Sequence, residues 1–152
     1  MAQQLDYHWI MPNLAQGSYP EPPLSAFKDF DILVLCAKEL QSKSTRAPNG
    51  KHLVRLTMED DIYRPVMPKD AQRYHGTARE LAKAVMRGKK VLVTCAQGVN
   101  RSGLITSLIV MNLTTLPGRD VVRMLRQRRK VGGGAYPLMN PMFESFVVNA
   151  RR

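Results

Sequence analysis

Apolar residues along the chain fall into short continuous runs and longer periodic segments. The short runs are typical of strands buried on both faces. They occur at Asp31–Ala37 (DILVLCA), Leu53–Leu56 and Val91–Thr94. Trp9–Ile10 and Leu14–Gln16 predict two further short strands on either side of a turn.

The longer segments repeat apolar residues at intervals of three and four, which is typical of amphipathic helices. The clearest extends from Pro68 to Arg87, directly before Gly88. Ser102–Leu113 is apolar nearly all round and predicts a buried helix, and Asp120–Arg129 and Asn140–Ala150 predict two more. Strands that alternate with helices predict an α/β fold, with a central, mostly parallel sheet covered on both sides.

Length and cysteine content narrow the class of protein. A chain of 152 residues can bury a core without covalent staples, so we expect residues 1–152 to form one domain. Two cysteines do not make a disulfide framework, which favours a reducing, cytoplasmic compartment. No apolar run approaches the ~20 residues of a membrane span, and the first residues lack the pattern of a signal peptide.

The net charge indicates an anionic partner. Twenty-three Lys and Arg against twelve Asp and Glu give +11, which suits phosphorylated proteins, nucleic acid or an acidic membrane surface. The basic run Arg126–Lys130 (RQRRK), followed by Gly132–Gly134, is either a solvated helix end or a patch that steers anions to a site. His8, His52 and His75 are scattered without metal-ligand spacing, so no metal is expected.

The stretch VLVTCAQGVNRSGL, Val91–Leu104, carries the candidate chemistry. A loop that joins a strand to a helix N-terminus has free backbone N–H groups, and Gly98 and Gly103 allow an anion to approach them closely. The guanidinium of Arg101 can hold two oxygens of a phosphate at once. Because the same positive field stabilises a thiolate, Cys95 is a candidate nucleophile directed at a bound phosphorus.

This arrangement resembles the cysteine-based phosphatases of the protein-tyrosine phosphatase superfamily and, by size, the compact dual-specificity phosphatases. The stretches WIMPNLAQGSYP, DILVLCAKE and NPMFESF are similar to the opening strands, a core strand and the closing helix of that family. The resemblance implies catalysis through a phosphocysteine on Cys95, without cofactor or metal. It also implies a phosphate-binding loop, made of Cys95, Ala96, Gln97, Gly98, Val99, Asn100 and Arg101. The family usually has a histidine before the cysteine, where this chain has Thr94.

The resemblance also implies roles for residues outside this loop. The family has a general acid, an aspartate, after a strand that precedes the cysteine; in RLTMEDDIYRP, Asp60 fits best and Asp61 is the alternative. Ser102 would hydrogen-bond the cysteine sulfur, in addition to a role as a helix cap. Cys36 lies in LCAKE, which is similar to an LCAE segment that carries a redox partner of the nucleophile in some lipid phosphatases; otherwise it is a small core residue.

Three functions remain open. The favoured one is a protein phosphatase acting on phosphotyrosine and, in addition, on phosphoserine or phosphothreonine. An RNA 5′-triphosphatase is the alternative, because CAQGVNRSG resembles the C-x-x-G-x-N-R-[ST]-G loop of those relatives and the charge suits RNA. A non-catalytic phosphate-binding module is third, and the presence of Cys95, Arg101 and a candidate acid argues against it. A phosphoinositide substrate is a weaker option, since the loop contains no lysine. The sequence assigns no oligomeric state.

Overall fold

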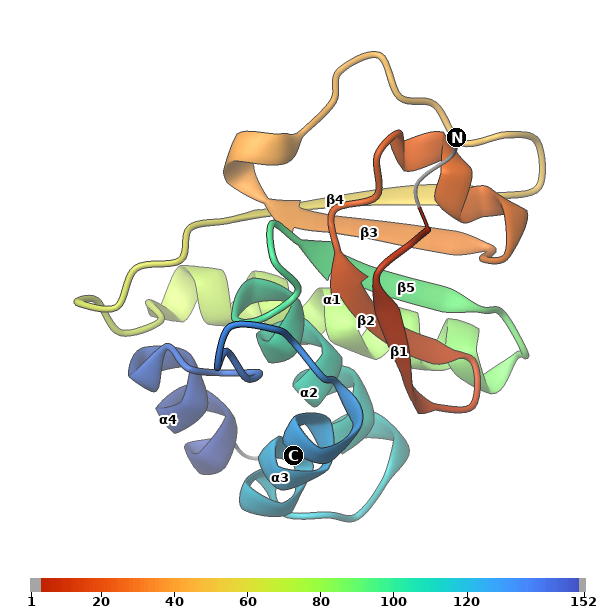
Figure 1. The fold of residues 1–152 in the computed structure, drawn as a ribbon. Coiled ribbons are helices and arrows are strands. Elements are labelled where there is room, and N and C mark those ends of the chain that lie inside the picture. The colour runs from red at the N-terminus through yellow and green to blue at the C-terminus, as the bar shows by residue number, and fades with distance from the viewer. Residues whose placement is uncertain (1–3, 151–152) are drawn as a thin grey trace.

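One five-stranded sheet organises residues 4–150, the part of the chain that this computed structural model describes (Figure 1). The elements in chain order are β1 (Tyr7–Met11), β2 (Leu14–Ser18), the 3₁₀ helix η1 (Pro23–Lys28), β3 (Ile32–Ala37), the 3₁₀ helix η2 (Lys38–Leu40), β4 (His52–Met58), α1 (Pro68–Met86), β5 (Val91–Cys95), α2 (Arg101–Leu113), α3 (Gly118–Arg128) and α4 (Pro141–Asn149). Each strand and helix predicted from the apolar pattern is present, with ends that differ by a few residues.

The strand order places β5 in the middle of the sheet. The order is β1-β2-β5-β3-β4, and β5 pairs in parallel with β2 on one side and β3 on the other. Among the strand pairs of residues 4–150, only β1–β2 is antiparallel. The predicted mostly parallel sheet is therefore confirmed. The loop that leaves β5 emerges at the centre of the carboxyl edge, where α/β proteins commonly bind ligands.

The two faces of the sheet are covered differently. The α-helices lie together on one face (Figure 1), where Val34 and Cys36 of β3 join the larger core. On the other face, Leu33 and Leu35 pack against Ala26 and Phe27 of η1 in a smaller core. Both faces are covered as predicted, but the second is covered by a 3₁₀ helix and aromatic side chains, because the segment between β2 and β3 forms no α-helix.

Among residues 4–150, no helix has the length and apolar character needed to cross a membrane.

Candidate active site

The loop between β5 and α2, Cys95–Arg101, is called the phosphate loop here. It turns sharply over the carboxyl end of β2. Gly98 has a φ of +69°, and a Cβ on it would lie 2.5 Å from the backbone carbon of Gly17. A residue with a side chain would therefore be both strained and too close to β2. Gly98 thus allows the backbone of β2 to approach the loop closely, a contact that the sequence did not predict.

The carbonyl groups of the phosphate loop are held from outside the loop. The carbonyl of residue 96 accepts a hydrogen bond from the amide of Tyr19, and that of residue 99 accepts one from the amide of Leu138. Between them, the carbonyl of residue 97 accepts from Arg129, and that of residue 98 accepts from both Arg129 and Gln16. In a trans peptide the C=O and the following N–H point in opposite directions. The N–H groups of residues 97–100 therefore face the inside of the loop, where they can surround an anion.

Cys95 lies at the base of this ring of amides. It is 3% exposed, and its Sγ is 3.3 Å from the Oγ of Ser102, a fully buried residue in the first turn of α2. As a thiol, Cys95 donates to Ser102; as a thiolate, it accepts from the Ser102 hydroxyl. Cys95 and Ser102, for which the family resemblance implied a hydrogen bond, are thus in contact.

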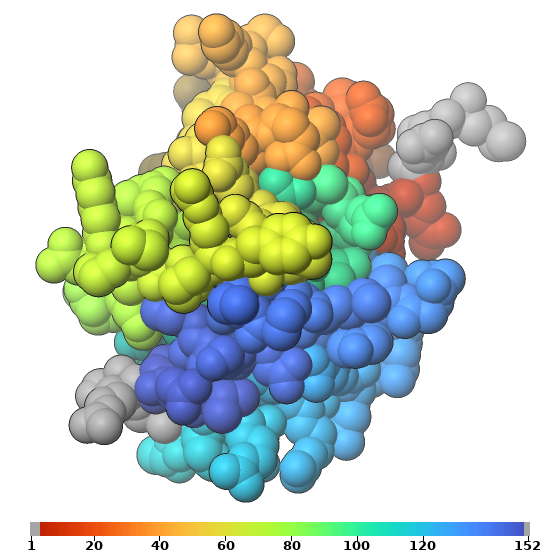
Figure 2. Space-filling model, turned by 90° about the vertical axis from the view of Figure 1, so that its left-hand side faces the viewer, coloured from red at the N-terminus to blue at the C-terminus, as the bar shows by residue number. Residues whose placement is uncertain are grey.

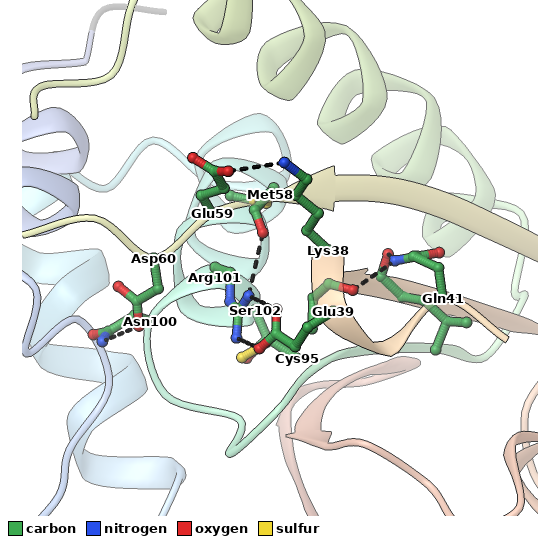
Figure 3. A network of polar contacts seen from close by, with 12 residues as sticks. Lys38, Glu39, Gln41, Met58, Glu59, Asp60, Cys95, Asn100, Arg101 and Ser102 are labelled. Atoms are coloured by element: carbon green, nitrogen blue, oxygen red, sulfur yellow. Dashed lines mark hydrogen bonds and ion pairs between the residues drawn. The ribbon is translucent and has the colours of Figure 1, made fainter.

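Arg101 points back over the loop, and a carboxylate holds it there (Figure 3). Its Nη1 and Nη2 donate to the two oxygens of Glu39 at 2.5 and 2.7 Å, and Nη1 also donates to the carbonyl of Met58. These hydrogen bonds with Arg101 lower the pKa of Glu39 to about 2. Burial opposes the charge of Arg101, but the contact with Glu39 raises its pKa. Among the described residues, the buried Nε of Arg101 has no hydrogen-bond partner.

The structure distinguishes the two candidate acids by the direction of their side chains. Asp60 points toward the phosphate loop: its oxygens accept from Nδ2 of Asn100 at 2.8 Å and from Nδ2 of Asn140 at 2.7 Å. Asp61 accepts instead from the amide of Tyr63, on its own loop. Of the two candidate acids, Asp60 therefore lies beside the phosphate loop, and the Asp61 side chain is bonded within its own loop.

Comparison with known proteins agrees with this geometry. Residues 14–144 match the family described as dual specificity phosphatase, catalytic domain. The chain belongs to this family. No curated protein matches it.

Solved structures share the fold at low sequence identity. Human DUSP28 is 21% identical with a TM-score of 0.72, covering 95% of this chain and 92% of its own. The PTP-2 phosphatase of Cydia pomonella is 18% identical with a TM-score of 0.73, covering 95% and 89%. OH1 from the Orf virus, described as a tyrosine phosphatase with triple substrate specificity, is 18% identical with a TM-score of 0.68, covering 97% and 87%.

The basic run of this dual specificity phosphatase is part of the support of the phosphate loop. Arg129 has a side chain that is 0% exposed and binds both oxygens of Asp6 at 2.8 Å. It also donates to the carbonyls of Gln97 and Gly98. The hydrogen bond from Arg129, more than any other contact, lowers the pKa of Asp6. The interpretation of this arginine as a solvated or steering charge is wrong.

The neighbouring arginines of that run are also bound. Arg126 donates to the carbonyls of Pro137 and Leu138 and pairs with Glu144. Arg128 donates to the carbonyl of Ile10. Both side chains therefore hold the end of α3 against neighbouring segments.

The second cysteine, Cys36, lies on β3, the strand next to the one that ends at Cys95. The register pairs Leu35 with Thr94, so the following residues, Cys36 and Cys95, are neighbours on β3 and β5. Cys36 is 0% exposed, and burial raises the pKa of its thiol well above the ordinary value. Thr94, in the place of the family's usual histidine, donates to the carbonyl of Val34 at 2.8 Å.

A pocket of about 500 Å³ opens beside Arg101 and Asp60; the other lining residues are Lys38, Glu39 and Glu59. Three of these five side chains are carboxylates, and Lys38 is paired with Glu59 at 2.9 Å. The positive charge of the chain is thus not concentrated at this opening. Figure 2 shows the segment around residues 60–65, in yellow, at the surface above the C-terminal part of the chain in blue.

Sequence reasoning missed four residues that hold this site together: Gln16, Glu39, Arg129 and Asn140. One signal was available for Gln16, since a polar residue interrupts a run otherwise suited to a buried strand. Asn140 begins α4 as its N-cap, accepting from the amide of Met142, and its position before a proline and an apolar segment is typical of such a cap.

Proposed function

We propose that this chain hydrolyses phosphomonoesters on proteins, phosphotyrosine and also phosphoserine or phosphothreonine, with residues 1–152 acting as one catalytic domain. One observation carries the proposal. A ring of inward-facing amides has Cys95 at its base, Arg101 over it and Asp60 at its rim.

In the first step, the Cys95 thiolate attacks the phosphorus and the bond to the leaving oxygen breaks. The amides of the phosphate loop and Arg101 stabilise the charge on the other phosphate oxygens. The unpartnered Nε of Arg101 is available to one of them. Asp60 donates a proton to the leaving oxygen. The product is a phosphocysteine.

In the second step, a water molecule attacks the phosphocysteine, and the S–P bond breaks. Asp60, now a carboxylate, takes a proton from the water. The Ser102 hydroxyl donates to the departing sulfur, which favours its release as a thiolate. Phosphate then leaves, and Cys95 returns to its starting state.

The lining of the pocket favours a protein substrate over RNA. A polyanion gains affinity from cations that neutralise its phosphates, but Glu39, Glu59 and Asp60 surround the opening beside Arg101. The alternative, an RNA 5′-triphosphatase, is supported by the net charge of +11 and by the sequence of the loop.

A panel of substrates decides between these functions. The assay compares the kcat/KM for four substrates side by side: phosphotyrosine peptide, phosphothreonine peptide, phosphoinositide and 5′-triphosphorylated RNA. Cys95→Ser is the blank. We expect the phosphotyrosine peptide to have the highest kcat/KM. Faster release of phosphate from the RNA would replace the proposal by the alternative, and turnover of none of them would favour a phosphate-binding module.

Cys36 is proposed as the redox partner of the nucleophile, in a protein that works in the reducing cytoplasm. Peroxide oxidises the Cys95 thiolate to a sulfenic acid, and the Cys36 thiol displaces water from it to form a disulfide. Dithiothreitol then reduces the disulfide to both thiols. Mild peroxide should inactivate the wild type reversibly, whereas Cys36→Ser should recover only in part. Equal recovery of both proteins would make Cys36 a core residue only.

A further inference from the structure

Gln16 is a polar side chain in the middle of a buried strand. It is 0% exposed and lies on β2, paired in register with Val93 of β5. Its amide reaches under the phosphate loop, where Nε2 is 3.1 Å from the carbonyl oxygen of Gly98 and 3.1 Å from the Oγ of Ser102. The carbonyl of Val99 lies farther away, at 3.5 Å.

These neighbours fix which way the amide group of Gln16 faces. The carbonyl of Gly98 can only accept a hydrogen bond, so the amide nitrogen, and not the amide oxygen, must be turned toward it. The nitrogen carries two hydrogens. One is directed at Gly98, and the other is directed at the Oγ of Ser102.

The hydrogen bond from Gln16 to Ser102 determines where the Ser102 hydroxyl can donate its own hydrogen. A hydroxyl has one hydrogen to donate and two lone pairs that accept. Since Gln16 donates to Ser102, it occupies a lone pair and leaves the hydroxyl hydrogen free. The Sγ of Cys95 lies 3.3 Å from the same Oγ and is placed to receive that hydrogen when it is a thiolate.

We propose that Gln16 is a positioning residue that turns the Ser102 hydroxyl toward the sulfur of Cys95. It stabilises the thiolate and thereby speeds the release of Cys95 from phosphocysteine. The effect on phosphocysteine rests on the proposed function. The effect on the thiolate requires only the contacts described above.

The other half of the Gln16 amide makes no hydrogen bond within residues 4–150 that would stabilise the fold. Its Oε1 is buried and has no hydrogen-bond partner among the described residues. Leaving a buried polar atom unpaired destabilises the folded state. A methionine has nearly the same length and would remove this unpaired oxygen. The hydrogen bonds of the amide are therefore made by its donor side, which faces the phosphate loop and Ser102.

The test compares Gln16→Met, Ser102→Ala and the double variant in pre-steady-state assays with an aryl phosphate whose leaving group departs unaided. At a pH high enough to keep Cys95 ionised in every variant, we expect each single variant to show an unchanged burst rate, followed by steady-state turnover slower by about tenfold, the loss typical of a hydrogen bond to a charged group. The double variant should be no slower than Ser102→Ala, because Gln16 acts through Ser102. Ser107→Ala, which removes another buried hydroxyl from α2, is the control and should keep wild-type rates.

A second measurement needs no turnover. Alkylation of Cys95 by iodoacetamide, located by mass spectrometry, follows its thiolate when it is measured at one lower, fixed pH at which the thiol is only partly ionised. It should slow by the same factor in all three variants. If alkylation follows this pattern but no phosphoester is hydrolysed, the proposed function fails and the role of Gln16 in the thiolate stands.

Two results would overturn the proposal. One is a loss in the double variant equal to the product of the two single losses, since Gln16 would then act independently of Ser102. The other is wild-type alkylation and turnover in Gln16→Met. Folding is monitored by the melting temperature, which we expect to equal or exceed that of the wild type. Gln16→Leu serves as the second apolar variant if Gln16→Met does not fold.

Discussion

The phosphate loop and the acidic loop, Glu59–Pro65, meet at Asp60 but are held in different ways. Four consecutive carbonyls of the phosphate loop are bonded to groups outside it, and Cys95 is 3% exposed. The acidic loop lies at the surface, with Tyr63 84% exposed. Asp60 reaches the rest of the site through two side-chain amides, those of Asn100 and Asn140.

The difference separates the proposed nucleophile and its anion cradle from the proposed general acid. The anion cradle and the nucleophile are fixed when the protein folds, because buried strands and α2 surround them. Asp60, the proposed general acid, is held by hydrogen bonds from two side chains outside its own loop, and exposed loops of this kind are the segments that open most readily. Nucleophile and cradle should therefore tolerate changes at the acidic loop, while the acid should depend on the phosphate loop.

The largest expected effect comes from the phosphate loop itself. Cys95→Ser should abolish turnover, because a serine hydroxyl in this place is a far weaker nucleophile than a thiolate. It should still bind phosphate, since the amides and Arg101 remain. Turnover is measured as the release of phosphate. Phosphate binding is measured as the protection that inorganic phosphate gives against thermal unfolding. Turnover of an aryl phosphate near the wild-type rate would refute the mechanism.

A smaller effect is expected from the acid. Asp60→Asn should lower kcat for tyrosyl and alkyl phosphates by ~10²–10⁴-fold, and by much less for aryl phosphates that need no proton. Asp61→Asn is the matched control, because its side chain is bonded to Tyr63. A loss in Asp61→Asn but not in Asp60→Asn would mean that the neighbouring aspartate is the acid.

Smaller still is the effect of removing one support of Asp60. Asn140→Ser keeps a helix cap for α4 but loses the amide that donates to Asp60 at 2.7 Å. We expect kcat for phosphotyrosine peptide to fall by about tenfold, the effect of one hydrogen bond to a charged group. Alkylation of Cys95 should be unchanged, because its cradle does not involve this residue. A uniform loss for every substrate, including those with good leaving groups, would place the role of Asn140 in folding instead.

The two loops also differ in how far the sequence predicts them. The phosphate loop was predictable because Cys95 and Arg101 are close in the chain, and an apolar strand and helix on either side fix their surroundings. Its supports were not, since Gln16 and Gly98 are 82 residues apart and only the strand order brings them together. Apolar periodicity shows which face is buried but not which polar group pairs with which. Arg129 lies among five successive polar residues, and nothing in that run distinguishes the one that is buried.

The smallest effect concerns Glu39, the carboxylate that holds Arg101. Its pKa is lowered from 4.5 to about 2 by the hydrogen bonds from Arg101. A lowered pKa means that the ionised form stabilises the folded state above pH 4.5, and that this contribution is lost as the pH falls toward 2. Glu39 is 56% exposed, so solvent screens the pair and we expect no more than ~1 kcal/mol.

The measurement is urea unfolding of the wild type and Glu39→Gln at a series of pH values that spans this interval. The stability of the wild type should decline more steeply than that of the variant as the pH is lowered, and the two curves should converge at the acid end. Glu39→Gln should keep the fold of the phosphate loop, because the loop is supported from the opposite side by Gln16 and Arg129. Parallel curves over the whole interval would show that the Glu39–Arg101 pair orients the guanidinium without adding to stability. Loss of phosphate protection in the same variant would show that the orientation of Arg101 depends on Glu39 more than on Met58.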